Sequence, residues 1–200
     1  ESSVSDKEVI LVVNIEIDKV AYKMATRKLA HIPKGINRAT KNAINRTISA
    51  TNKFIHTELK DTYTVKVSEI KHGLEKENAT ISKLSGKVVA SGPVLRASGF
   101  KNDTSIPKEY VVSIKRRGKR ALPEQAFVAK MPKNNGKQRR QHKGIFIRKG
   151  KERLGIRELT GPSIPGMASS KPIRGKVTKV MYKKFNERFD HEVNYLLSKK

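Results

Sequence analysis

Cysteine is absent from this chain of 200 residues, which excludes disulfide bonds and metal sites built on thiolates. Tryptophan is absent as well, and the six phenylalanines and five tyrosines offer few rings on which nucleic-acid bases could stack. No apolar run reaches the roughly 18 residues that a membrane-spanning helix needs. These absences argue against a disulfide scaffold, a membrane span and base-specific recognition of single strands.

Acidic residues are scarce: 18 Asp and Glu stand against 44 Lys and Arg, for a net charge of +26. Self-repulsion on this scale opposes a compact free monomer. The composition therefore predicts a polyanion or a charged assembly as partner. Nucleic acid is the first candidate, an acidic protein surface the second and an anionic membrane surface the third.

Catalytic signatures are missing too. The five histidines are scattered, and the chain has no His-Glu-x-x-His pattern, phosphate-binding glycine loop or nucleophile elbow. The carboxylates of Glu109, Glu124, Glu152 and Glu158 are too dispersed to predict a nuclease-type metal cluster. We therefore expect neither an enzyme nor a cofactor or metal site.

Positive charge concentrates between residues 115 and 153, where fifteen Lys and Arg stand against two Glu. The excess, 15 − 2 = 13, is half of the total. Basic loops of this kind neutralise phosphates without reading sequence, and they serve equally well to bind an acidic protein surface. The predicted contact residues, for DNA or an acidic partner, are Arg116, Arg117, Lys119, Arg120, Arg139, Arg140 and Lys143.

Hydrophobic periodicity predicts helices over 18–30, 33–59 and 177–197, with a brief helix over 68–74. The strand signals are a pair around Ser85-Gly86 within 79–90, a strand over 109–115 and a hairpin over 144–159. Residues 91–104 read as a loop, and the proline-rich stretch 160–167 as a shaped loop. The predicted class is α+β: long N-terminal helices, a central, mostly antiparallel sheet with basic hairpin loops, and a C-terminal amphipathic helix packed on that sheet.

The first 17 residues are predicted to form an N-terminal strand or arm, with 18–200 as a single α+β domain. Val9–Ile17 (VILVVNIEI) has the composition of a strand, and the segment is locally acidic. Such a strand could pair with a basic neighbouring subunit, or it could be the ordinary first strand of the domain.

Several stretches taken together resemble the minor tail protein Z family of tailed bacteriophages and prophages. No one motif is diagnostic; their order and spacing carry the resemblance, and the acidic start, residues 1–17, departs from the family pattern. The stretches are GINRATKNAINRTISA (35–50), TVKVSEIKHGL (64–74), AFVAKM (126–131), GIFIRKGKERLGIREL (144–159), TGPSIPGMA (160–168) and FNERFDHEVNYLL (185–197).

The resemblance implies a structural virion protein that completes the tail. It would sit at the head-proximal end of the tail tube, as a ring of six subunits around the DNA passage, after assembly in the host cytoplasm. The implied partners are the tail tube, tail terminator or head–tail connector proteins and the backbone of the phage DNA, with no membrane. The alternative is a cellular, ribosome-associated nucleic-acid-binding protein, which would bind RNA tightly and in a salt-sensitive way.

Overall fold

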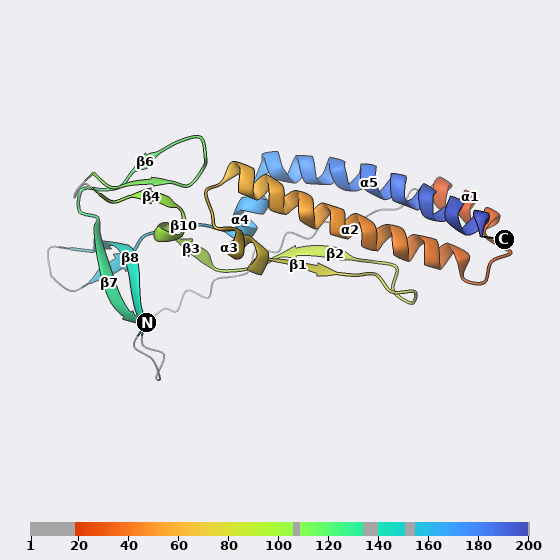
Figure 1. Ribbon diagram of the computed structural model, residues 1–200, viewed down its shortest axis with the longest axis horizontal. Coiled ribbons are helices and arrows are strands. Elements are labelled where there is room, and N and C mark those ends of the chain that lie inside the picture. Colours follow the sequence, from red (N-terminus) through yellow and green to blue (C-terminus); the bar gives the residue numbers. More distant parts are fainter. Residues whose placement is uncertain (1–18, 106–108, 134–139, 151–154, 200) are drawn as a thin grey trace.

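The structure, a computed structural model, describes residues 19–105, 109–133, 140–150 and 155–199. The molecule is elongated: the long helices, with the hairpin of residues 74–90 alongside them, form one end, and the other small sheets form the opposite end (Figure 1). The predicted N-terminal arm, residues 1–17, lies outside the described residues. The α+β class is confirmed.

The described helices include all three long helices that periodicity predicted. Their ends are displaced by one to three residues, except that the last helix begins at Lys171, six residues before its predicted start. The short helix expected after Ser68 is present as well. The bounds are α1 Lys19–Lys28, α2 Gly35–Thr62, α3 Val67–His72, α4 Ile164–Ala168 and α5 Lys171–Ser198.

The described strands are short and pair in antiparallel fashion within four separate sheets, whereas the sequence predicted one central sheet. The sheets are β1–β2, β3–β10, β4–β5–β6 and β7–β8–β9. The bounds are β1 Leu74–Glu77, β2 Lys87–Ala90, β3 Val94–Arg96, β4 Lys101–Asp103, β5 Val111–Ser113, β6 Arg120–Ala121, β7 Phe127–Lys133, β8 Arg140–Arg148, β9 Ile156–Glu158 and β10 Thr160–Ser163, with a 3-10 turn η1 at Ala97–Gly99.

Helix α5 packs along α2, which corrects the prediction that it would pack on the sheet. Lys176 Nζ lies 2.8 Å from Glu58 Oε2, and Asn42 Nδ2 donates to Glu192 Oε2 at 3.0 Å, so the two helices run antiparallel. The apolar positions of α5 recur every four residues and drift around the helix. Helix α1 contacts a second part of that stripe, since Tyr22 stacks on Phe189 at 6.5 Å between ring centroids.

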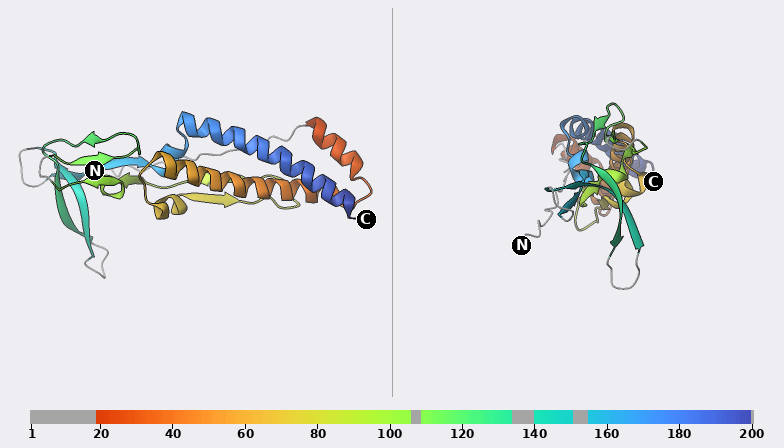
Figure 2. Two further views of the ribbon diagram at one scale, coloured as in Figure 1. Left: turned by 45° about the horizontal axis from the view of Figure 1, so that its top comes forward. Right: turned by 90° about the vertical axis from the view of Figure 1, so that its left-hand side faces the viewer.

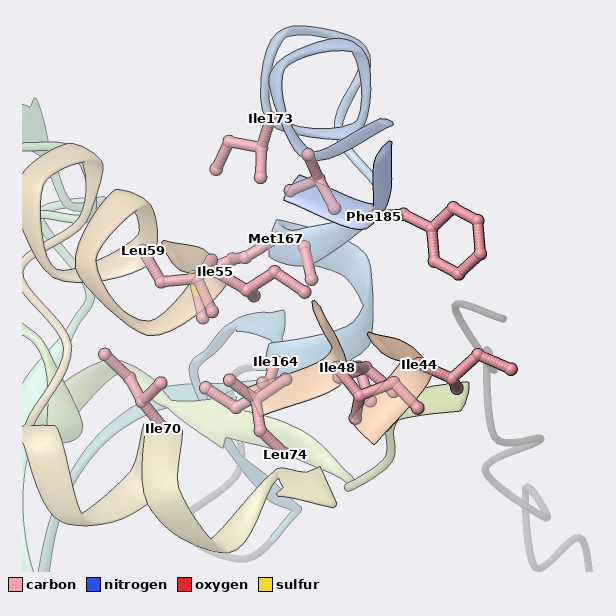
Figure 3. Packing of buried hydrophobic residues seen from close by; sticks show 14 of the residues in the cluster. Ile44, Ile48, Ile55, Leu59, Ile70, Leu74, Ile164, Met167, Ile173 and Phe185 are labelled. Carbon is pink, nitrogen blue, oxygen red and sulfur yellow. The ribbon is translucent and has the colours of Figure 1, made fainter. Parts of the chain in front are cut away.

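One apolar cluster joins the helices to the nearest strands (Figure 3). The stripe predicted on α2 supplies Ile44, Ile48, Ile55 and Leu59, all at most 2% exposed. Phe185 of α5 is also 2% exposed and lies near the middle of the helix pair. Burial of a side chain such as Leu or Phe contributes about 1.5–3 kcal/mol, so this cluster positions the sheet end against the helices.

Three predictions between residues 79 and 168 are wrong. The partner of β2 is β1, which lies before residue 78, rather than a strand at 79–84. The predicted loop 91–104 contains β3, η1 and β4. The predicted shaped loop 160–167 is β10 followed by α4, whose Ile164 and Met167 are buried in the core. These elements are three to five residues long and depend on partners distant in sequence, which a local pattern does not reveal.

Candidate polyanion-binding face

The first basic cluster forms the turn between β5 and β6, and the structure fixes this turn against the end of α2. Arg116 Nε donates to Lys60 O at 2.8 Å, and Arg116 N donates to Thr62 O at 2.9 Å. Cationic donors are favourable at a helix C-terminus, where backbone carbonyls lack helical partners. Arg116 therefore has a structural role in addition to the predicted contact role.

The remaining side chains of this turn face solvent. Arg117, Lys119 and Arg120 are exposed, and Gly118 takes a φ of 128°, which favours glycine at the tip. Across the sheet, the Ser105 N–H donates to the Asp103 carboxylate at 3.1 Å and holds the pKa of Asp103 below its usual value, with Lys119 adding to the effect. Asp103 thus stays charged and offsets part of this cluster.

The second basic cluster belongs to a long two-stranded ribbon, β7–β8, rather than to a loop. Strand β8 begins at Arg140, so the predicted loop residues Arg140 and Lys143 lie within the strand. Arg139 and the side chain of Arg140 lie outside the described part of the molecule. Lys143 is directly opposite Lys130 on β7, and both are exposed. Like charges directly opposite one another destabilise a sheet, so this pair favours an anion between or above the two lysines.

A groove of about 650 Å³ opens beside the ribbon, between α3, β3 and β8. Its apolar lining comes from Val94, Leu95, Val128 and Ile145. The cationic lining residues are Lys66, Arg96 and Lys143, against one lining carboxylate, Glu69. Arg96 Nε also lies 3.3 Å from Glu158 Oε2. The ion pairs of the described residues include neither Lys66 nor Lys143, so their charges are available to a ligand.

The structure therefore separates the predicted contact residues into two places. The β5–β6 turn faces back toward the end of α2, and the β7–β8 ribbon projects away from the helices (Figure 2). The region around the ribbon and groove also contains Lys66, Arg96 and Lys130, which the sequence analysis did not identify. The alternation in AFVAK (126–130) puts Lys130 on the face of Val128, but its opposition to Lys143 follows only from the register.

The described residues hold no cluster of three or more His, Asp or Glu side chains arranged to bind a metal ion. Among the helices of the described ranges, none is long and apolar enough to cross a membrane. The ribbon and groove can bind anions through their lysine and arginine donors, and the groove can accommodate apolar side chains beside those donors.

The chain matches no protein-family profile, no curated protein and no solved structure.

Proposed function

We propose that this chain is a structural protein of a phage tail, a tail completion component at the end of the tail tube that meets the head. Its basic ribbon and groove contact the DNA backbone or an acidic neighbouring protein. Self-association into a ring, six-fold like the tail tube, would place several such faces around the DNA passage. The resemblance of the six stretches to minor tail protein Z supports the tail assignment.

The observation that carries the binding part of this proposal is the opposition of Lys130 and Lys143 beside the cationic groove. A folded chain tolerates two facing lysines at a cost of up to about 1 kcal/mol, and a bound anion removes that cost. Phosphate contacts of this kind position a protein on DNA without reading its sequence. A structural protein around a DNA passage needs binding of that type.

The test is electron microscopy of particles from the phage or prophage that encodes the chain. Particles are produced with the chain, without it, and with the Lys130→Glu/Lys143→Glu variant. Without the chain we expect tails whose upper ends are unfinished and fail to join heads, and we expect the ribbon variant to show the same defect. The matched control is Lys76→Glu/Lys83→Glu, which changes charge equally at exposed positions of the β1–β2 hairpin and should leave particles normal.

Normal particles in the absence of the chain would overturn the tail assignment. If the chain from the same lysate then co-sediments with ribosomes or cellular RNA, the alternative of a ribosome-associated nucleic-acid-binding protein is favoured. A defect shared equally by both double variants would show that net charge matters and that the ribbon has no special role.

A further inference from the structure

We propose that the groove beside β3 binds the N-terminal segment of a second copy of this chain, with residues 9–17 added as a strand to the outer edge of β3. The inference deepens the self-association part of the proposed function and rests on it. It names the interface through which copies join, and it assigns a role to the acidic segment that departs from the family resemblance.

The groove runs along a strand edge that can accept another strand. Four consecutive residues, Pro93–Arg96, line it. Successive side chains of a strand point to opposite faces, so a groove that touches all four follows the edge of β3 rather than one of its faces. Among the described strands, β3 has β10 as its hydrogen-bonded neighbour. The other edge is suited to β-augmentation, in which an extended segment adds main-chain hydrogen bonds and places alternate side chains in pockets.

The chemistry of the groove matches an acidic, apolar segment. Val94 is 46% exposed at the mouth, beside the apolar lining described above, and exposed apolar surface at a strand edge is a site of pairing. Lys66 and Lys143 supply positive charge next to this apolar surface. An occupant therefore needs apolar side chains for the lining and carboxylates for the lysines.

The N-terminal segment has both the apolar side chains and the carboxylates that the groove requires. Residues 1–18 contain five carboxylates against one lysine, a net charge of −4, so the remaining 182 residues carry 26 + 4 = +30. Within VILVVNIEI, Glu16 alternates with Ile15 and Ile17, and Asp18 follows directly. Strand-forming Val and Ile make up most of the run. Sequence and groove are therefore complementary in charge, in apolar character and in backbone conformation.

The connection to α1 keeps the end of the run that carries Glu16 out of the groove of its own chain. Tyr22 of α1 stacks on Phe189, one turn before Glu192, which contacts Asn42. Phe189 precedes Glu192 by three residues on the antiparallel α5, so α1 lies about level with Asn45 of α2, 62 − 45 = 17 residues before Thr62. At 1.5 Å per residue, about 25 Å of α2 separates α1 from the groove.

The groove residues Lys66 and Glu69 come after that helix end. Ile17 is two residues before Lys19, so it lies within about 7 Å of the start of α1. Ile15 and Glu16 precede Lys19 by at most four residues, which span about 14 Å and fall short of the separation given above. The end of the run that carries Glu16 can therefore reach only the groove of another copy. Since each copy has one such segment and one such groove, the contact is head-to-tail, the type that closes into rings when the rotation permits.

The absence of cysteine from the chain makes disulfide trapping in full-length protein a direct test. Chains with Ile15→Cys and chains with Val94→Cys are prepared separately, mixed at micromolar concentration and oxidised. We expect a disulfide-linked pair in which mass spectrometry identifies the 15–94 bond. A doubly substituted Ile15→Cys/Val94→Cys chain should give a ladder of covalent oligomers. The matched control is Ile81→Cys, 42% exposed in the β1–β2 connection, which should trap far less with Ile15→Cys.

Charge reversal gives a second readout. Lys143→Glu in the Val94→Cys chain should lower the yield of the trapped pair several-fold, and Glu16→Lys in the Ile15→Cys chain should restore it. Equal trapping at Val94 and Ile81, or a disulfide only within one chain, would overturn the inference. If the mixed chains form the trapped pair but particles assemble normally without the chain, this inference stands and the proposed function is overturned. If particles need the chain but the mixed chains form no trapped pair, the proposed function stands and this inference is overturned.

Discussion

Three threonines, Thr40, Thr47 and Thr51, are buried along α2 at no more than 1% exposure, and their hydroxyls are not equivalent. Thr47 Oγ1 donates to Ala43 O at 2.8 Å. Thr51 Oγ1 is buried without a hydrogen-bond partner within the described part of the chain. A buried hydroxyl without a partner costs about 1–3 kcal/mol relative to water. The Thr51 hydroxyl therefore lowers the stability of the fold, whereas the Thr47 hydroxyl, one turn earlier on α2, is hydrogen-bonded.

We predict that Thr51→Val raises the free energy of unfolding by about 1 kcal/mol, because valine keeps the branched shape and removes the unsatisfied hydroxyl. Thr47→Val is the matched control on the same helix face. It removes a hydrogen bond and should give no gain and a loss of up to about 1 kcal/mol. Chemical denaturation of both variants measures the difference, and equal effects would contradict the distinction between the two hydroxyls.

Gly73 allows a close approach between the end of α3 and α4. A Cβ at this position would lie 2.8 Å from Ile164 Cβ. The backbone cannot shift freely, because Gly73 N donates to Glu69 O at 3.0 Å and Ser91 N donates to Gly73 O at 3.0 Å. We predict that Gly73→Ala lowers the free energy of unfolding by about 1–3 kcal/mol through overpacking.

Gly99→Ala is the control for this prediction, since among the described residues, apart from its two chain neighbours, no heavy atom lies within 4 Å of the position that its Cβ would take. Its effect on the free energy of unfolding should stay within about 0.5 kcal/mol. If a thermal or denaturant melt gives the two alanine variants the same free energy of unfolding, α4 does not pack closely against the end of α3.

At the scale of elements, the helices were predictable and most strand partners were not. The stripe from Ile44 to Leu59 on α2 repeats with helical period, so the helix and its buried face follow from local sequence. Strand β1 (LEKE) has no apolar alternation and forms because β2 pairs with it across a nine-residue connection, residues 78–86. Partner choice decides such strands, and a local pattern contains no information on partners.

The same reasoning explains why the candidate site was predicted in part. Lys143 belonged to a visible cluster of charge. Lys66 and Arg96 are single cations in short elements, and they reach the groove only because α3, β3 and β8 converge there. The partner of α5 was also mispredicted, since a stripe identifies the buried face of a helix and leaves open whether a sheet or another helix covers it.

The β7–β8 ribbon makes a prediction in which stability and binding change in opposite directions. Lys130→Glu places a carboxylate opposite Lys143 and replaces repulsion with attraction, so the free chain should gain about 0.2–1 kcal/mol. The same change removes one cation from the proposed interface with DNA. Affinity for a duplex of about 30 base pairs should fall, and the slope of log affinity against log salt should lessen by about 1 for each phosphate that the variant no longer neutralises.

Lys76→Glu is the control for this pair of measurements, because Lys76 is exposed on β1 opposite Val88 and changes the net charge equally. It should leave the salt slope close to that of the unchanged chain. If Lys76→Glu and Lys130→Glu weaken DNA binding to the same degree, the ribbon is no more than part of a diffuse positive surface.

At the scale of the whole molecule, a net charge of +26 on 200 residues gives salt two opposite effects. In the free chain, salt screens self-repulsion and should stabilise the fold. Raising ionic strength from 0.01 M to 0.15 M shortens the Debye length from about 30 Å to about 8 Å. Charges at the two ends of this elongated molecule are then screened from one another. In a DNA complex, the same salt weakens the binding of phosphate.

We therefore predict that the Tm of the free chain rises by a few degrees over this range of salt, while the additional stabilisation by duplex DNA disappears. DNA at 100 times its Kd stabilises the folded state by about 2.7 kcal/mol, and a Kd that increases steeply with salt removes that increment. Differential scanning fluorimetry with and without duplex, at matched salt, measures both slopes. A free-chain Tm that falls with salt would contradict dominant self-repulsion, and a DNA increment that persists at 0.15 M would show that interactions other than phosphate neutralisation hold the complex.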